Sequence, residues 1–231
     1  MESAALCGHT QGMSFYLVVF ILPLAAGFAA QWWVRRAVAR AQEVPVGMTG
    51  AEAAHRILAR HGAMQVRVEQ STDGPLTDHY DPRAQVIRLS DQIYNRDSAA
   101  AVAIAAHECG HALQHHTAHA MFRVRTRLAP AAAVASQLWV LPLMLGVFAG
   151  FYGLIWVAVA LFSAVLLFHL VTLPVEIDAS RRALRILRED GMIDAQTAPA
   201  ARGVLTAAAS TYIVAALTSI AMLIYILGVR R

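Results

Sequence analysis

Residues 105–120 read AAHECGHALQHHTAHA and place five histidines within thirteen positions. The first two, His107 and His111, frame the pattern His-Glu-x-x-His. Residues four apart lie on one face of a helix, so both imidazoles can reach the same metal ion. Glu108 lies beside that face, where its carboxylate can take a proton from a water molecule on the ion. The pattern therefore predicts a zinc centre for hydrolysis, although so short a pattern also occurs without function.

The other three histidines of the cluster are poorly placed for the same ion. The compact three-histidine motif needs a histidine ten residues after His107, where this chain has Thr117. His115 lies two turns from His107 and off its face, so contact with substrate or exposure to solvent is the simpler interpretation. His116 points to the opposite side, and His119 could turn back only if the helix ended near Thr117. We expect a polar helix end here.

A catalytic zinc ion usually takes three protein ligands and one water molecule, so the third ligand must come from elsewhere. Glu176 is the strongest candidate, because it is the first acidic residue after Glu108 and begins a helical segment behind an apolar stretch. Asp178 is its rival on the same helix, and pairing with Arg181 or Arg182 is the simpler role for it. Glu176 itself could instead be a rim carboxylate paired with one of these arginines.

The composition indicates a membrane protein. The 231 residues are 58% apolar and 15% charged, with a mean hydropathy of +0.50, whereas soluble domains are about 45–50% apolar. A spanning helix needs about 20 mostly apolar residues, and four windows qualify. These windows are residues 14–34, 130–149, 151–173 and 204–228. No positive charge precedes the first window, so we expect a retained anchor and not a cleaved signal.

Arginine placement predicts the orientation of the chain. Twelve arginines lie within 35–127 and five within 181–202. The positive-inside rule therefore puts residues 35–129 and 174–203 in the cytoplasm, with the terminal pair Arg230-Arg231 as a mild exception. The formal charge of +4, without a basic patch interleaved with aromatic residues, gives no support for binding nucleic acid.

The elements that must position the histidines lie in the segment 35–129. Turn residues, caps and alternating apolar positions predict two helices and three short extended stretches there. They are a helix from the capping box Thr49-Gly50-Ala51-Glu52 to Gly62, a strand at Val66 and Val68, a hairpin through 76–90 that turns at Asp81-Pro82, helical sequence from Ser90 or Asp91, and a helix over 98–116 capped by Asp97 or Ser98.

This arrangement suggests how a peptide would bind. We expect an extended substrate to add a strand to the hairpin arm 85–90. His79 or Tyr80 could then donate a hydrogen bond to the developing oxyanion, although Tyr80 could equally be a packing residue.

Three blocks of the chain resemble the bacterial neutral zinc metallopeptidases of the YugP type. They are TDHYDPR with IRLS, AAHECGHALQH, and LVTLPVEIDASRRAL. The resemblance runs from about Thr49 to Ala216 and implies a membrane-bound metallopeptidase with a zincin-like core. It implies that His107 and His111 are metal ligands and that Glu108 is the catalytic acid and base. Glu176 matches the acidic position expected to give the third ligand. Cys109 departs from the small residue usual inside the motif, and we expect it to be a core residue.

We therefore expect a mainly α-helical integral membrane protein with about four transmembrane helices and a small cytoplasmic α+β zincin-like metallopeptidase domain. The expected segments are an N-terminal membrane anchor (1–34), the catalytic segment (35–129), a transmembrane pair (130–173), a cytoplasmic helix with the third ligand (174–203) and a C-terminal transmembrane helix (204–231).

The expected activity is zinc-dependent (Zn²⁺) endopeptidase cleavage at the cytoplasmic face of the bacterial inner membrane. The partners would be a peptide or membrane-protein substrate and the lipid bilayer, with no nucleic acid. Two alternatives remain. One is a site-2-type intramembrane protease, for which Glu189-Asp190-Gly191 could supply the later Asp-Gly motif. The other is a membrane scaffold with a structural metal, although a purely structural site has no use for Glu108.

Overall fold

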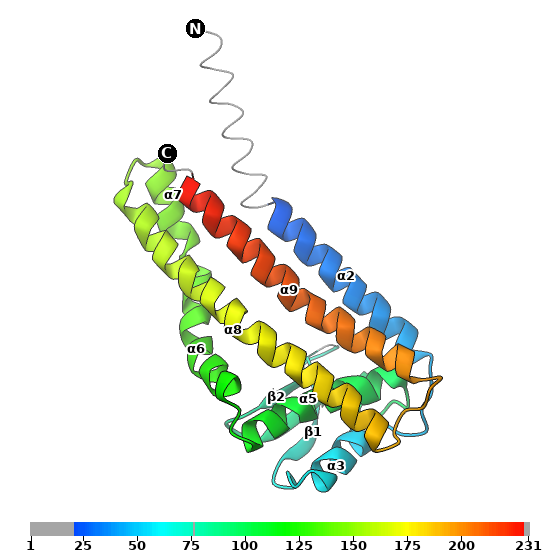
Figure 1. The fold of residues 1–231 in the computed structure, drawn as a ribbon. Coiled ribbons are helices and arrows are strands. Elements are labelled where there is room, and N and C mark those ends of the chain that lie inside the picture. Colours follow the sequence, from blue (N-terminus) through cyan, green and yellow to red (C-terminus); the bar gives the residue numbers. More distant parts are fainter. Residues whose placement is uncertain (1–20, 76, 229–231) are drawn as a thin grey trace. The chain divides into compact units, whose positions relative to one another are not determined.

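The computed structural model describes residues 21–75 and 77–228, which form a mainly helical protein with one small sheet (Figure 1). The helices are α2 (Leu22–Gln42), α3 (Gly50–Arg60), α4 (Asp91–Tyr94), α5 (Ala99–His116), α6 (Ala120–Leu138), α7 (Val140–Phe148), α8 (Gly153–Glu189) and α9 (Ala198–Gly228). The strands are β1 (Arg67–Ser71), β2 (His79–Asp81) and β3 (Val86–Ser90).

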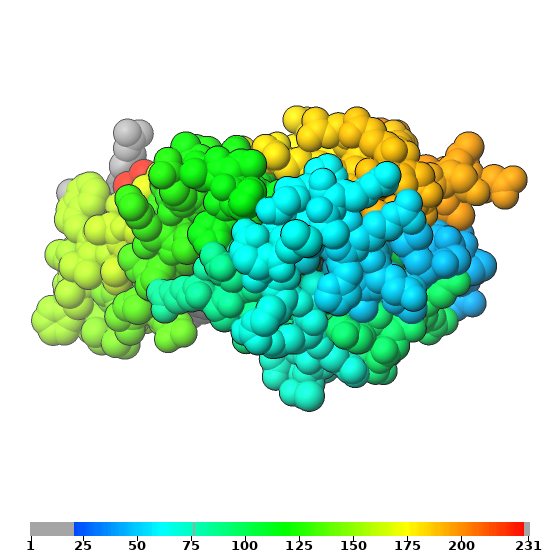
Figure 2. Space-filling view, turned by 90° about the horizontal axis from the view of Figure 1, so that it is seen from below, coloured from blue at the N-terminus to red at the C-terminus, as the bar shows by residue number. Residues whose placement is uncertain are grey.

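The chain divides into two compact units. The first, which we call the apolar unit, contains the described residues up to Gln31, Arg125–Val171 and the described residues from Thr211 onward. The second, the α/β unit, contains Trp32–Val124 and Thr172–Ser210. In Figure 2 the cyan surface of α3 and the strands makes up much of one face of the α/β unit.

Three stretches of the described chain are long and apolar enough to cross a membrane. They are Ala120–Phe148, Gly153–Glu189 and Ala198–Gly228, whose most apolar 18-residue windows have mean hydropathies of 1.8, 2.6 and 2.0. They include the last three predicted windows, but the first of them begins well before residue 130, so that Pro130 lies inside α6. In the remaining window, 14–34, residues 14–20 lie outside the described residues and the rest belongs to Ile21 and α2.

The turn between α7 and α8 contains Gly150, the residue that separates the predicted windows 130–149 and 151–173. Gly150 has a φ of +76°, a left-handed conformation that costs glycine little because it has no Cβ. The chain reverses through this residue before α8 begins at Gly153.

In the α/β unit, the predicted caps form as expected. The Thr49 side chain accepts a hydrogen bond from the Glu52 backbone N–H, and the Glu52 carboxylate accepts one from the Thr49 N–H, which makes a complete capping box for α3. Ser98 caps α5 by accepting from the Ala101 N–H. Asp97, the alternative cap, instead accepts hydrogen bonds from the backbone N–H groups of Val46 and Gly47, in the loop between α2 and α3.

The sheet has the strand order β1-β3-β2. The predicted hairpin forms, since β2 pairs antiparallel with β3 and the Asp81 carboxylate accepts from the N–H groups of Arg83 and Ala84 in the turn. Because β1 pairs with the other side of β3 in parallel, both edges of β3 are occupied. The prediction that a substrate would add to the arm 85–90 is therefore wrong. Among the described strands, the edges are β1 and β2.

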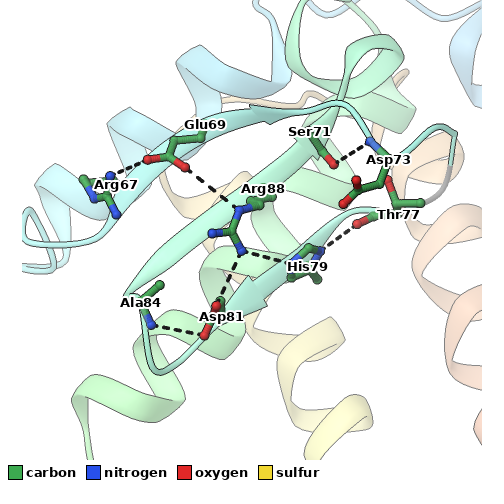
Figure 3. Close-up of polar contacts among 9 residues, drawn as sticks. All are labelled: Arg67, Glu69, Ser71, Asp73, Thr77, His79, Asp81, Ala84 and Arg88. Carbon is green, nitrogen blue, oxygen red and sulfur yellow. Dashed lines mark hydrogen bonds and ion pairs between the residues drawn. The ribbon is translucent and has the colours of Figure 1, made fainter.

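Arg88, on the central strand, links both neighbouring strands through its side chain (Figure 3). Its Nε lies 4.0 Å from a Glu69 carboxylate oxygen on β1, and one terminal nitrogen lies 3.5 Å from an Asp81 oxygen on β2. The same nitrogen lies 3.5 Å from the His79 ring. Such partly exposed pairs contribute little each, about 0–1 kcal/mol, so they set side-chain orientation more than stability.

Candidate metal centre

The structure brings His107 and His111 of α5 together with Glu176 of α8, all within the α/β unit. One potential ligand atom from each lies within 4.8 Å of the others. The Nε2 atoms of His107 and His111 lie 3.2 and 3.4 Å from the same Glu176 oxygen. Glu176 is only 1% exposed, so it is not a rim carboxylate. The pairing with Arg182 belongs to Asp178, at 2.6 Å.

These three donors fit a zinc ion by spacing and by chemistry. Zinc bonds to imidazole nitrogen and carboxylate oxygen are about 2.0–2.1 Å, so neighbouring ligand atoms of a tetrahedral site lie about 3.3 Å apart. The distances from Glu176 to both imidazoles are close to that value. A buried carboxylate also needs a compensating charge, and a divalent cation would supply it.

Glu108 is buried on α5 next to this group. Burial raises the pKa of its carboxyl group, and the nearby Glu176 carboxylate raises it further, while His107 acts in the opposite direction. The Glu108 carboxylate also accepts a hydrogen bond from the backbone N–H of Tyr80, on edge strand β2. A carboxyl group of raised pKa beside a metal site is suited to accept and return a proton.

Cys109 is a core residue, as predicted. It is fully buried, and its thiol donates a hydrogen bond to the Ala54 carbonyl oxygen across the contact between α5 and α3. Burial raises the pKa of the thiol well above its usual range, which keeps it protonated and unreactive.

The three remaining histidines of the cluster lie at the end of α5 and beyond, outside the group that could hold a metal. His116 is exposed and contacts the Gln65 side chain at 3.2 Å. His119 accepts a long hydrogen bond, 3.4 Å, from a nearby backbone N–H. His115 is half-buried, and its Nδ1 lies 2.8 Å from the Tyr80 hydroxyl. Burial raises the pKa of Tyr80 to about 12, so its phenol remains a neutral hydrogen-bond donor.

Two side chains to which the sequence assigned no role contact the Nδ1 atoms of the histidines. Gln114 lies 3.0 Å from Nδ1 of His111, and Ser180 lies 3.2 Å from Nδ1 of His107. Neutral amides and hydroxyls have no metal-ligand signature. The available signal was position: Gln114 is three residues after His111, and Ser180 one turn after Glu176, so each pair shares a helix face.

Comparison with known proteins agrees with this geometry. The model of the family described as "Putative neutral zinc metallopeptidase" matches residues 16–231. The chain belongs to this zinc peptidase family. Among curated proteins it is similar to the "Putative membrane protease YugP" of Bacillus subtilis (strain 168), with 40% identity over 207 residues, covering 89% of this chain and 92% of that protein. No solved structure matches the chain.

Proposed function

We propose that this protein is a membrane-bound zinc endopeptidase whose ion is held by His107, His111 and Glu176. The observation that carries the proposal is the convergence of these three donors from two helices that are far apart in sequence. Membership of a zinc peptidase family and the name of the related membrane protease support the same activity.

In this proposal, Glu108 is the catalytic acid and base. When bound, a zinc ion supplies a Lewis acid that polarises a carbonyl group and lowers the pKa of a water molecule to about 7. Glu108 accepts the proton of the attacking water and passes it to the leaving amine nitrogen as the peptide bond breaks.

The substrate strand would lie along β2, the edge strand whose Tyr80 N–H already reaches Glu108. Adding a strand to a sheet edge fixes an extended peptide through backbone hydrogen bonds and is independent of its sequence. Tyr80 remains a candidate donor to the oxyanion because its phenol stays protonated. His79 is a weaker candidate, since its ring contacts the Thr77 carbonyl and Arg88.

Two observations disfavour the site-2-type alternative. The helix that carries the histidines, α5, is not among the candidate spans of the described chain. Asp190 of the Glu189-Asp190-Gly191 sequence pairs with Arg60 and contacts His61 where α8 ends, and Gly191 continues the turn with a φ of +65°. The scaffold alternative leaves the buried Glu108 without a role.

We further propose that the α/β unit faces the cytoplasm of a bacterial inner membrane, as the arginine distribution predicts. A reporter fused after Ala41 or within 190–200 should then have cytoplasmic activity. Periplasmic activity from either fusion would reverse the orientation without affecting the chemistry of the site.

The activity is tested with detergent-purified protein and a casein-type substrate. A zinc chelator should abolish cleavage, and stoichiometric Zn²⁺ should restore it, because the proposed reaction needs both the ion and the protein donors. Hydrolysis that persists after complete removal of metal would contradict a zinc mechanism, as would a zinc-loaded, folded protein that cleaves neither casein nor membrane-protein substrates.

A further inference from the structure

The Nδ1 atom of His111 contacts a buried side chain, Gln114, that the proposed mechanism does not use. This atom is the ring nitrogen that does not face Glu176. Gln114 is 0% exposed. Its Nε2 donates one hydrogen bond to the Val175 carbonyl oxygen at 2.9 Å and another to an Asp178 carboxylate oxygen at 2.8 Å. Its Oε1 lies 3.0 Å from Nδ1 of His111. All polar atoms of this amide therefore have partners, on α5 at one end and on α8 at the other.

These partners determine which way the amide faces. An amide nitrogen only donates and an amide oxygen only accepts, whereas a carbonyl and a carboxylate can only accept. Nε2 of Gln114 must therefore face Val175 and Asp178, and its oxygen must face His111. The imidazole then has to donate from Nδ1, which leaves the lone pair of a neutral ring on Nε2. That nitrogen is the one that lies 3.4 Å from Glu176.

The Asp178 carboxylate, which accepts a hydrogen bond from the Gln114 amide, accepts a second one from an arginine. Arg182 lies one turn further along α8 and donates to the same Asp178 oxygen at 2.6 Å. A chain of hydrogen bonds thus runs from Arg182 through Asp178 and Gln114 to His111. His107 has a simpler arrangement, with only the Ser180 hydroxyl 3.2 Å from its Nδ1.

The same amide also connects the two segments that supply the ligands. Val175 and Asp178 lie on either side of Glu176 in α8, and Gln114 is one turn beyond His111 in α5. One side chain therefore contacts both a histidine and the helix that carries the carboxylate opposite it.

We propose that Gln114, oriented by Asp178, is the positioning residue that fixes His111 as the Nδ1–H tautomer, so that its Nε2 is ready to bind metal. The role in metal binding rests on the proposed function, but the tautomer is a property of the chain without metal. Groups that hold a metal-ligating histidine through its second nitrogen typically contribute about 10–100-fold to metal affinity.

The test compares Gln114→Leu, which keeps most of the volume and removes all three hydrogen bonds, with Gln92→Leu, the same substitution at an exposed site on α4. Nitrogen-15 NMR of histidine-labelled, metal-free protein reports the tautomer, and competition with a chelator reports zinc affinity. In Gln114→Leu the Nδ1–H tautomer of His111 should lose its dominance and zinc should bind about 10–100-fold more weakly. Gln92→Leu should match the wild type in both measurements.

A second pair of substitutions isolates the orienting carboxylate. Asp178→Asn keeps an acceptor for the amide and should retain most of the zinc affinity, whereas Asp178→Ala removes it and should weaken binding. If Gln114→Leu does not fold, Gln114→Met provides the same deletion with an unbranched side chain.

An unchanged His111 tautomer in a folded Gln114 variant would overturn this inference. Failure of the proposed function looks different: zinc would bind equally well to wild type and to His111→Ala, while the tautomer measurement in metal-free protein would still decide the role of Gln114.

Discussion

The apolar unit and the α/β unit differ in whether their large apolar side chains lie on the surface or in the interior. In the apolar unit many of these side chains face outward, and only 22% of each candidate spanning window is buried. No Asp, Glu, Lys or Arg occurs in residues 128–171 or 211–228. In the α/β unit, side chains such as Ile57, Ile87 and Leu187 are fully buried. A lipid solvent around the candidate spanning helices would account for the difference, because apolar side chains gain nothing by avoiding it.

This difference also decides which of the two units can hold a polar catalytic site. Buried polar groups need partners, and the α/β unit supplies them for Glu108, Gln114 and His111. Helix α8 contributes residues to both units, up to Val171 in one and from Thr172 in the other. Substitutions in the two units should therefore have effects of very different size, even where the chemical change is the same.

The largest effect should come from Glu108→Gln. The amide keeps the shape of the side chain but cannot accept and return a proton, so kcat should fall by about 10²–10⁴-fold. Zinc content should remain at the wild-type level because all three proposed ligands remain. Glu43→Gln, the same change on an exposed side chain, is the control and should leave turnover unaltered. Wild-type turnover by Glu108→Gln would remove the catalytic role from this residue.

Next in size should be the loss of zinc in Glu176→Ala. Two imidazoles without the carboxylate make an incomplete site, since a catalytic zinc needs three protein ligands. Metal analysis should show occupancy falling strongly, while His115→Ala, His116→Ala and His119→Ala remain near one ion per chain. Asp178→Ala should have an intermediate effect through its hydrogen bond to Gln114.

The opposite pattern of zinc occupancy would assign the third zinc ligand to another residue. Full zinc occupancy in Glu176→Ala, combined with loss in Asp178→Ala or His119→Ala, would mean that the third donor is misassigned.

A smaller effect is expected from Gly110→Ala, which tests how closely α5 and α8 must approach. A Cβ at Gly110 would lie 2.9 Å from the Ala179 carbonyl oxygen, a backbone atom that cannot rotate away. The helices would have to separate, which should destabilise the fold by about 1–3 kcal/mol and weaken zinc binding. Gly203→Ala on α9 is the matched control, because no atom lies within 4 Å of its added Cβ. Equal melting temperatures for the two variants would show that this contact is not tight.

Much of the α/β unit could be predicted from local sequence. The capping box of Thr49 and Glu52, the turn at Asp81 and the cap at Ser98 depend on residues within a few positions of one another. The structure also brings Glu176 to the histidines, as the spacing of acidic residues predicted.

The errors and omissions are in long-range features. The parallel pairing of β1 with β3 is not set by any turn, so the sequence could not show that the arm 85–90 is central. The pairing of His115 with Tyr80 joins residues 35 positions apart and gives one histidine of the expected polar helix end a half-buried contact. In the sequence, Gln114 is indistinguishable from an ordinary helical residue. Its role depends on a hydrogen bond to the Val175 carbonyl oxygen of α8, 61 residues away.

The smallest expected effect is that of Leu217→Ala in the apolar unit, and it is measured against Leu187→Ala in the α/β unit. Leu187 is 0% exposed, so its truncation should leave a cavity and destabilise the protein by about 2–5 kcal/mol. Leu217 is 61% exposed, and its side chain would remain in contact with lipid or detergent before and after truncation. We expect its effect to be within about 0.5 kcal/mol, as for surface positions generally. Thermal unfolding in detergent, followed by circular dichroism, compares the two variants. A destabilisation by Leu217→Ala as large as that of Leu187→Ala would mean that this face of α9 packs against protein, such as a second copy of the chain. The contrast between the two units would then no longer hold at that position.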